Sequence, residues 1–176
     1  MRDNDRVLVA YGTKYGATAE IAEAIGKVLS AAALDVDVIR ARRVRSLEPY
    51  GAVVLGSAVY AGRWRRDAMR LLRREQLPQR QVWLFSSGPV GEDTGDPEQR
   101  ERFTKPRRVQ ELAVRIGVRE PVVFGGRVAD DAGFIRKKMA RKIPPALRDR
   151  RDWGEIEAWA GSIAASLHTG STVAGS

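Results

Sequence analysis

Residues 12–18 combine glycines with hydroxyl side chains and follow an apolar run at residues 6–11. If this segment joins a strand to a helix, backbone N–H groups and the positive helix end both attract an anion, and phosphate is the usual one. Gly12 and Gly16 allow close approach of the backbone, and Thr13 and Thr18 offer hydroxyl donors. The segment lacks the P-loop and GxGxxG patterns. We predict an anion-binding loop, with an ordinary threonine-capped turn as the alternative.

Two later segments also follow apolar runs, Gly56–Trp64 after residues 52–55 and Ser86–Gly91 after residues 81–85. In a doubly wound sheet such loops meet at the carboxyl edge of the strands, where ligands bind. Tyr60 and Trp64 could each stack on a flat ring, with core packing as the alternative for each. The three segments together predict a planar, phosphorylated ligand. Its candidate contacts are Thr13, Lys14, Tyr15, Gly16, Ala17, Thr18, Ser57, Ala58, Val59, Tyr60, Ala61, Gly62, Trp64, Ser86, Ser87, Gly88, Pro89 and Gly91.

Three arginines, Arg63, Arg65 and Arg66, stand beside the second of these segments. The guanidinium fork matches a carboxylate, so the three could bind an acidic substrate. Cations at a helix N-terminus oppose the helix dipole, which makes a purely structural role less natural. A solvated helix start is the alternative.

The elements that would position these segments alternate along the chain. Apolar runs predict strands at 6–11, 36–38, 52–56, 81–85 and 121–126, and helical spacing predicts helices at 18–33, 67–74, 106–117 and 152–167. This order indicates an α/β fold, a doubly wound five-stranded parallel sheet with helices on both faces. Val36 and Val38 alternate with aspartates, as in an outer strand. We expect one domain over residues 1–168 and a disordered small-residue tail at 169–176.

A basic insertion is expected at about residues 129–151. Residues 134–151 hold eight basic side chains and one acidic one, with Ile135, Met139 and Ile143 at helical spacing. This composition suits an amphipathic helix at a membrane surface or an acidic ligand, with a solvated surface helix as the alternative. No segment is apolar enough to span a membrane, and no signal-peptide region precedes the first strand. We expect a cytoplasmic protein, with surface attachment to a membrane left open.

The composition limits the chemistry. The chain has no cysteine and one histidine, which excludes disulfides and thiolate sites and disfavours a histidine-based catalytic or metal centre. The 176 residues carry a net charge of +9, which suggests a partner or ligand that is acidic. Nucleic acid is disfavoured, because no recognised binding module is present and the aromatics are not interleaved with the basic run. We predict no metal site and assign no catalytic acid or base.

The segment Thr13-Lys14-Tyr15-Gly16-Ala17-Thr18 resembles the phosphate loop of the flavodoxin-like family, roughly Thr/Ser-x-Thr-Gly-x-Thr. Thr13, Gly16 and Thr18 match it and Tyr15 departs from it. Residues 13–22, 56–62 and 152–160 are similar to the menaquinone-dependent protoporphyrinogen oxidase branch of that family. The resemblance covers residues 6–167. It implies FMN, with the phosphate at residues 13–18 and the ring between residues 57–64 and 86–91.

The resemblance also implies a function, that of an FMN-dependent oxidoreductase. Protoporphyrinogen is the substrate that the branch implies, with a quinone acceptor, and the arginines would suit its propionates. Residues 86–91 contain no aromatic, unlike those of electron-carrier members, which would leave one ring face open. In this branch the insertion would serve substrate or quinone access. The alternatives are a flavodoxin-type electron carrier, although carriers of this family tend to be acidic, and a protein that binds a deazaflavin with an acidic tail.

Overall fold

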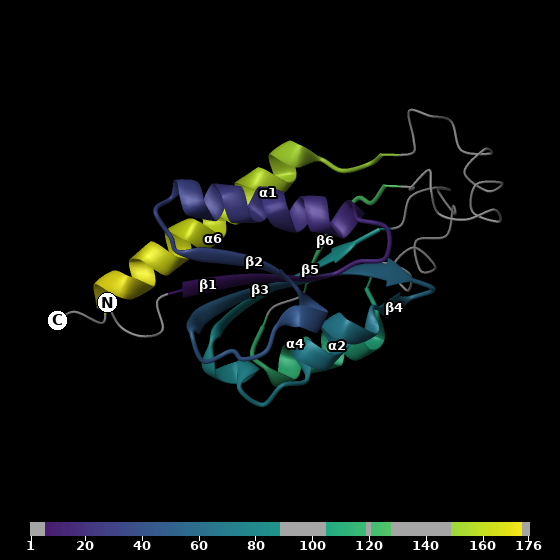
Figure 1. The fold of residues 1–176 in the computed structure, drawn as a ribbon, viewed down its shortest axis with the longest axis horizontal. Helices are drawn as coiled ribbons and strands as arrows, with labels where there is room; N and C mark the ends of the chain where they lie inside the picture. Colours follow the sequence, from purple (N-terminus) through teal and green to yellow (C-terminus); the bar gives the residue numbers. More distant parts are fainter. Residues whose placement is uncertain (1–5, 89–104, 119–120, 128–148, 174–176) are drawn as a thin grey trace.

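The computed structural model describes residues 6–88, 105–118, 121–127 and 149–173, and its centre is a parallel sheet (Figure 1). Five strands lie in the order β2-β1-β3-β5-β6, and every neighbouring pair among them is parallel. Their bounds are Arg6–Gly12 for β1, Val36–Arg40 for β2, Tyr50–Tyr60 for β3, Gln81–Ser87 for β5 and Val122–Phe124 for β6. The predicted α/β fold with a doubly wound parallel sheet is confirmed.

The strand order reverses between β1 and β3. From β1 the chain moves outward to β2, and from β3 it moves the other way to β5 and β6. Loops that leave neighbouring strands in opposite directions open a crevice at this point, which is where open α/β sheets bind their ligands. The segments after β1 and β3 therefore stand at the switch point of the sheet.

Helices cover both faces of the sheet (Figure 1). On one face α1 (Ala17–Ala31) packs against α6 (Trp153–Val173), and on the other lie α2 (Arg66–Leu72), α4 (Arg107–Arg115) and the short helices η1 (Ala41–Arg43) and η2 (Leu77–Gln79). Alternate side chains of β1 point to opposite faces of the sheet and so enter two different hydrophobic cores. Val7 and Val9 pack with α1 and α6, whereas Leu8 and Ala10 pack with α2 and α4.

The segment after β3 is a hairpin, not the open loop that the sequence suggested. Strand β3 continues to Tyr60, and a short antiparallel strand, β4 (Arg63–Trp64), pairs with its end. The two turn residues Ala61 and Gly62 have φ angles of 48° and 66°. Positive φ at both central residues is the signature of a type I′ turn, which matches the twist of the strands it joins. Glycine is favoured at the second of these positions, but alanine is uncommon at the first, so the pair did not indicate the turn clearly.

The last helix also departs from expectation. Helix α6 runs to Val173, so the predicted tail at residues 169–176 begins too early. The Thr169 hydroxyl donates to the carbonyl of Ala165, and His168 Nε2 lies 3.0 Å from the carbonyl of Ala32, at the end of α1. These contacts continue the helix through residues whose intrinsic helix propensity is low.

Several predictions fall on residues outside the described ranges. Most of the basic segment at 134–151 does so, as do the candidate contacts Pro89 and Gly91. The two flanks of residues 128–148 are described, and they meet. Arg127 and Asp149 form an antiparallel bridge, and the N–H of Arg150 donates to the carbonyl of Gly126 over 3.0 Å. In the described part of the chain, no helix is long and apolar enough to cross a membrane.

Candidate functional site

The loop between β1 and α1 ends in a helix start that has no side-chain cap. Gly16 is the N-cap of α1, with a φ of 91°, and it makes no side-chain cap hydrogen bond. A Cβ added there would meet nothing within 4 Å, so the backbone angle, and not lack of space, favours glycine. The first N–H groups of any helix have no carbonyl partner within it. Those of Ala17, Thr18 and Ala19 thus face the loop with the positive end of the helix dipole behind them.

Two hydrogen bonds hold Thr13 in place, one to its side chain and one to its backbone carbonyl. Its hydroxyl oxygen accepts the N–H of Gly16 over 3.0 Å, and its carbonyl accepts Nη2 of Arg40 over 2.7 Å. Because the hydroxyl oxygen is already an acceptor, its own proton is left to donate elsewhere. Arg40, the last residue of β2, is not among the residues that the sequence pattern indicated. The available signal was its place at the end of an edge strand, where the carboxyl ends of β1 and β2 meet.

Thr18 carries the clearest sign of a missing partner. Its side chain is only 1% exposed, and its hydroxyl oxygen is buried without a hydrogen-bond partner in the described structure. An unsatisfied buried hydroxyl costs about 1–3 kcal/mol, so such groups are uncommon without a role. Together with the proton of Thr13 and the uncapped N–H groups, it makes a set of donors suited to a tetrahedral anion. Phosphate binding by this loop stays a prediction, which these donors suit.

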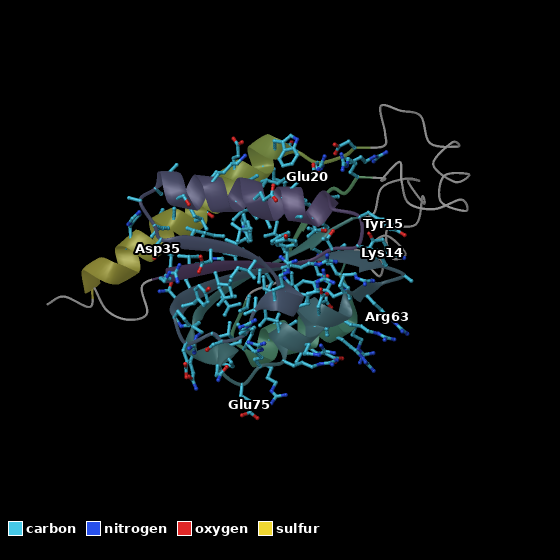
Figure 2. The ribbon with its side chains drawn as sticks, viewed as in Figure 1. Lys14, Tyr15, Glu20, Asp35, Arg63 and Glu75 are labelled. Atoms are coloured by element: carbon cyan, nitrogen blue, oxygen red, sulfur yellow. The ribbon has the colours of Figure 1, made fainter. Side chains whose placement is uncertain are left out.

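Tyr60 and Tyr15 bring the first two segments together. Their rings meet edge to face, with centroids 6.1 Å apart and an interplanar angle of 77°. The ammonium of Lys14 lies 5.0 Å from the centre of the Tyr15 ring. Figure 2 shows Lys14, Tyr15 and Arg63 at one edge of the molecule. Tyr15, which departs from the family motif, thus lines the same edge as the partly buried ring of Tyr60.

Trp64 does not offer a stacking face. Its side chain is 5% exposed within the core that α2 covers, and its Nε1 donates to the hydroxyl of Ser86 over 2.9 Å. The predicted stacking role of Trp64 is therefore wrong, and core packing is right. Because the indole bond links β4 to β5, it holds the hairpin that carries Tyr60 against the neighbouring strand.

The buried serines of this edge have structural partners. Ser57 accepts the N–H of Arg65 over 2.9 Å and donates to the carbonyl of Ala58 over 3.0 Å, and Ser86 accepts Trp64 as described. These bonds fix the hairpin and the start of α2. Contact of Ser57, Ser86 or Ser87 with a ligand stays a prediction.

The structure separates the three arginines that the sequence grouped. Arg63 and Arg66 are exposed, whereas Arg65 is partly buried and its Nε has no partner within the described ranges. Arg65 also lies close to the start of the first loop. A Cβ built on Gly12, the last residue of β1, would lie 3.0 Å from the Cβ of Arg65. Two of the three can therefore meet a substrate in solution, and the third packs against the loop.

A cluster of charges that the sequence did not suggest adjoins the first turn of α1. Glu20 binds Nη2 of Arg127 at 2.8 Å and Nη1 of Arg151 at 2.6 Å, and Arg151 also binds Asp149. The Arg151 side chain is 4% exposed and lies 4.7 Å from the centre of the Trp153 ring. The hydrogen bond from Arg151 lowers the pKa of Asp149, and the same bond raises the pKa of Arg151. The cluster ties the segments that follow β6 and precede α6 to α1, the helix that follows the candidate phosphate loop.

No metal centre is visible in the described residues. They contain no group of three or more histidine, cysteine, aspartate or glutamate side chains that could hold an ion. The ionisable groups with clearly shifted pKa values there, Arg6, Tyr50, Asp149 and Arg151, are engaged in ion pairs or hydrogen bonds with one another or with neighbouring carboxylates.

Fold and site together define an α/β protein with a candidate anion-binding loop at the switch point of a doubly wound sheet. The sequence pattern of the flavodoxin domain family matches residues 8–145, and the chain belongs to this family. No curated protein matches the chain.

Solved structures share the fold. A flavodoxin from the domain Archaea superposes with a TM-score of 0.63 at 17% identity, covering 93% of this chain and 99% of that one. Flavodoxin 2 from Bacillus cereus superposes with a TM-score of 0.57 at 20% identity, covering 93% of this chain and 98% of that one. The flavodiiron core of Flv1 from Synechocystis superposes with a TM-score of 0.62 at 13% identity, covering 96% of this chain and 37% of that one. At these identities the likeness is one of fold.

Proposed function

We propose that the chain binds FMN through residues 13–18 and acts as a flavin-dependent electron-transfer protein. The observation that carries the proposal is the buried, unpartnered hydroxyl of Thr18 at the uncapped start of α1. Flavodoxin neighbours of the same fold and the family membership of the chain support it.

The residues present fit this cofactor. The Thr13 and Thr18 hydroxyls and the first N–H groups of α1 would hold the phosphate. The ring would lie by Tyr60 and the hairpin, next to residues 86–88 at the end of β5. When bound, FMN supplies one-electron and two-electron redox chemistry. The role of the protein is then to anchor the phosphate, orient the ring and limit water around it.

Solved flavodoxins that share the fold over nearly their whole length support the electron-carrier function. Tyr50, whose pKa burial raises to about 12, lies at the start of β3, whereas the loops stand at the end of that strand, so Tyr50 is not a candidate acid or base for the site.

Flavin titration tests the proposal. FMN added to the apoprotein should show quenched flavin fluorescence, and riboflavin, which lacks the phosphate, should bind at least about 100-fold more weakly. That ratio is the expected loss of two hydrogen bonds to a charged group at about 1.5–3 kcal/mol each. Equal binding of FMN and riboflavin would remove the loop from the site. Binding of a deazaflavin with an acidic tail in place of FMN would identify the alternative cofactor.

A second candidate is the oxidation of protoporphyrinogen with a quinone acceptor. Its support is the exposure of Arg63, which pairs with Tyr60 in the hairpin, and of Arg66 at the start of α2, since their guanidinium groups could pair with the two propionates. The paired replacement Arg63→Gln and Arg66→Gln should then raise KM for protoporphyrinogen with menadione as acceptor and leave kcat nearly unchanged. Peripheral contact with a membrane through residues 134–151 belongs to this candidate, and co-sedimentation with anionic vesicles at low and high salt tests it.

A further inference from the structure

The two helical layers of the molecule carry opposite charge. Helices α1 and α6 on one face together hold four glutamates and one lysine. Helices η1, α2 and α4 on the other face hold seven arginines and two carboxylates. The positive charge of the described helices is therefore concentrated on a single side of the sheet.

The positive side includes a row of exposed arginines that we call the arginine face. On α2 and its C-cap, Arg66, Arg70 and Arg73 recur at i, i+4 and i+7, which places them on one stripe of the helix. Helix η1 packs against α2 and adds exposed arginines, and Arg63 of the hairpin extends the row toward the candidate flavin site. The arginine face comprises Arg42, Arg43, Arg63, Arg66, Arg70 and Arg73.

Within the part of the chain that the structure describes, these six side chains differ from most other arginines in having no side-chain partner. Arg6, Arg107 and Arg127 pair with carboxylates, and Arg74 and Arg80 donate to backbone carbonyls. The arginine face makes no ion pair or side-chain hydrogen bond within the described residues. Arg66 even stands in the first turn of α2, where a cation opposes the helix dipole. Clustered like charges of this kind destabilise the folded state, so their placement points to binding and not to folding.

We infer that the arginine face docks an acidic protein that exchanges electrons with the flavin; the electron exchange, but not the docking, rests on the proposed function. Charge complementarity sets the class of partner. Of the exposed large apolar side chains in the described chain, Val38 is on β2, Trp153 on α6 and Val114 on α4, so none is on the elements that carry the arginine face, η1, α2 and β4. Without apolar anchors a membrane surface is a poorer match than a carboxylate-rich protein. The row also starts at Arg63, beside the hairpin that bears Tyr60, so a partner on it would approach the flavin edge.

The probe for the test is a plant-type [2Fe–2S] ferredoxin, a strongly acidic one-electron carrier. Its binding to the chain without flavin is measured by fluorescence anisotropy at about 20 mM and about 200 mM salt, and its electron exchange with the FMN-loaded chain is measured by stopped flow. The matched pair of variants is Arg70→Glu on α2 and Lys27→Glu on α1. Both residues are exposed and both changes alter the net charge by the same amount. The double variant Arg66→Glu with Arg70→Glu extends the series, and circular dichroism checks its fold.

The expected result is salt-sensitive binding that Arg70→Glu weakens several-fold, that the double variant weakens at least about tenfold, and that Lys27→Glu leaves within about twofold. Steered association varies over such a range. Binding that both single variants weaken equally would assign the effect to net charge and overturn the inference. Absence of ferredoxin binding would overturn it as well, and so would preferential binding of a 20-base-pair DNA duplex. Because the anisotropy arm contains no flavin, failure of FMN binding does not alter the result for docking and counts only against the proposed function.

Discussion

Replacing Thr18 by valine should move stability and cofactor affinity in opposite directions. The side chain is 1% exposed and its hydroxyl has no partner within the described structure. Valine keeps the shape and removes the unsatisfied group, whose burial costs about 1–3 kcal/mol. The apoprotein should therefore gain up to about that much stability. In the presence of FMN the variant lacks one hydrogen bond to a charged phosphate, worth about 1.5–3 kcal/mol, so its Kd should rise roughly 10- to 150-fold.

Thr13→Val is the matched control for this prediction. The Thr13 hydroxyl accepts the N–H of Gly16, so its removal should destabilise the apoprotein, by about 1 kcal/mol, as well as weaken FMN. Thermal melting of both apoproteins and flavin fluorescence titration are the assays. If Thr18→Val lowers the melting temperature and leaves the Kd for FMN unchanged, the hydroxyl has a structural role and the reasoning that places the phosphate beside it fails.

Three further predictions concern the same fold. Gly16→Val should fold, at a cost of about 1–3 kcal/mol for its positive φ, and should lose FMN binding. Gly117 also has a positive φ and nothing within 4 Å of an added Cβ, so Gly117→Val should cost similar stability and leave the FMN titration unchanged. Tyr60→Ala should weaken FMN binding by about 1–2 kcal/mol and leave the melting temperature nearly unchanged, whereas Trp64→Ala should lower the free energy of unfolding by about 3–5 kcal/mol. Burial raises the pKa of Tyr50 to about 12 from its ordinary 10.0, so the stability that the neutral phenol provides is complete below pH 10 and is lost as pH rises toward 12; Tyr50→Phe should flatten that part of a stability–pH curve.

The sheet and the meeting of its loops were predictable because they depend on local patterns. The wholly apolar run at residues 52–55 lies in β3, in the middle of the sheet, and the alternating run at 36–38 lies in the edge strand β2. Parallel strands place their carboxyl ends on one side, so the glycine-rich segments after β1 and β3 could be assigned to the same edge. The loop at residues 13–16 was found for the same reason, since its glycine and hydroxyl pattern is contiguous.

The position of Trp64 was not predictable from its neighbours. An aromatic that follows a strand can pack inward or face a ligand, and both uses favour the same residue type. What decides between them is the Nε1 bond to Ser86, a residue 22 positions further along the chain. The turn at Ala61 and Gly62 was hidden in a similar way, because tertiary pairing of Trp64 with Val59 imposes a left-handed conformation that alanine alone disfavours.

The charge cluster around Glu20 shows the same limit at longer range. Its partners Arg127 and Arg151 stand 107 and 131 positions away, and each is an ordinary surface residue by sequence. The helix dipole explains why a carboxylate suits the first turn of α1, but not which cations will meet it. Only the fold, in which α6 packs against α1 and the segments after β6 and before α6 pair with each other, brings the three together.

Charge is the property whose meaning changes most between sequence and structure. If the net charge of +9 were spread evenly over the surface, the chain could not dock on basic partners as acidic carriers do. The fold instead separates glutamates on α1 and α6 from arginines on η1, α2 and α4. Association is steered by the local field of a face and not by the net charge. The excess of arginine is therefore compatible with electron transfer, provided that the partner which approaches the hairpin edge is acidic.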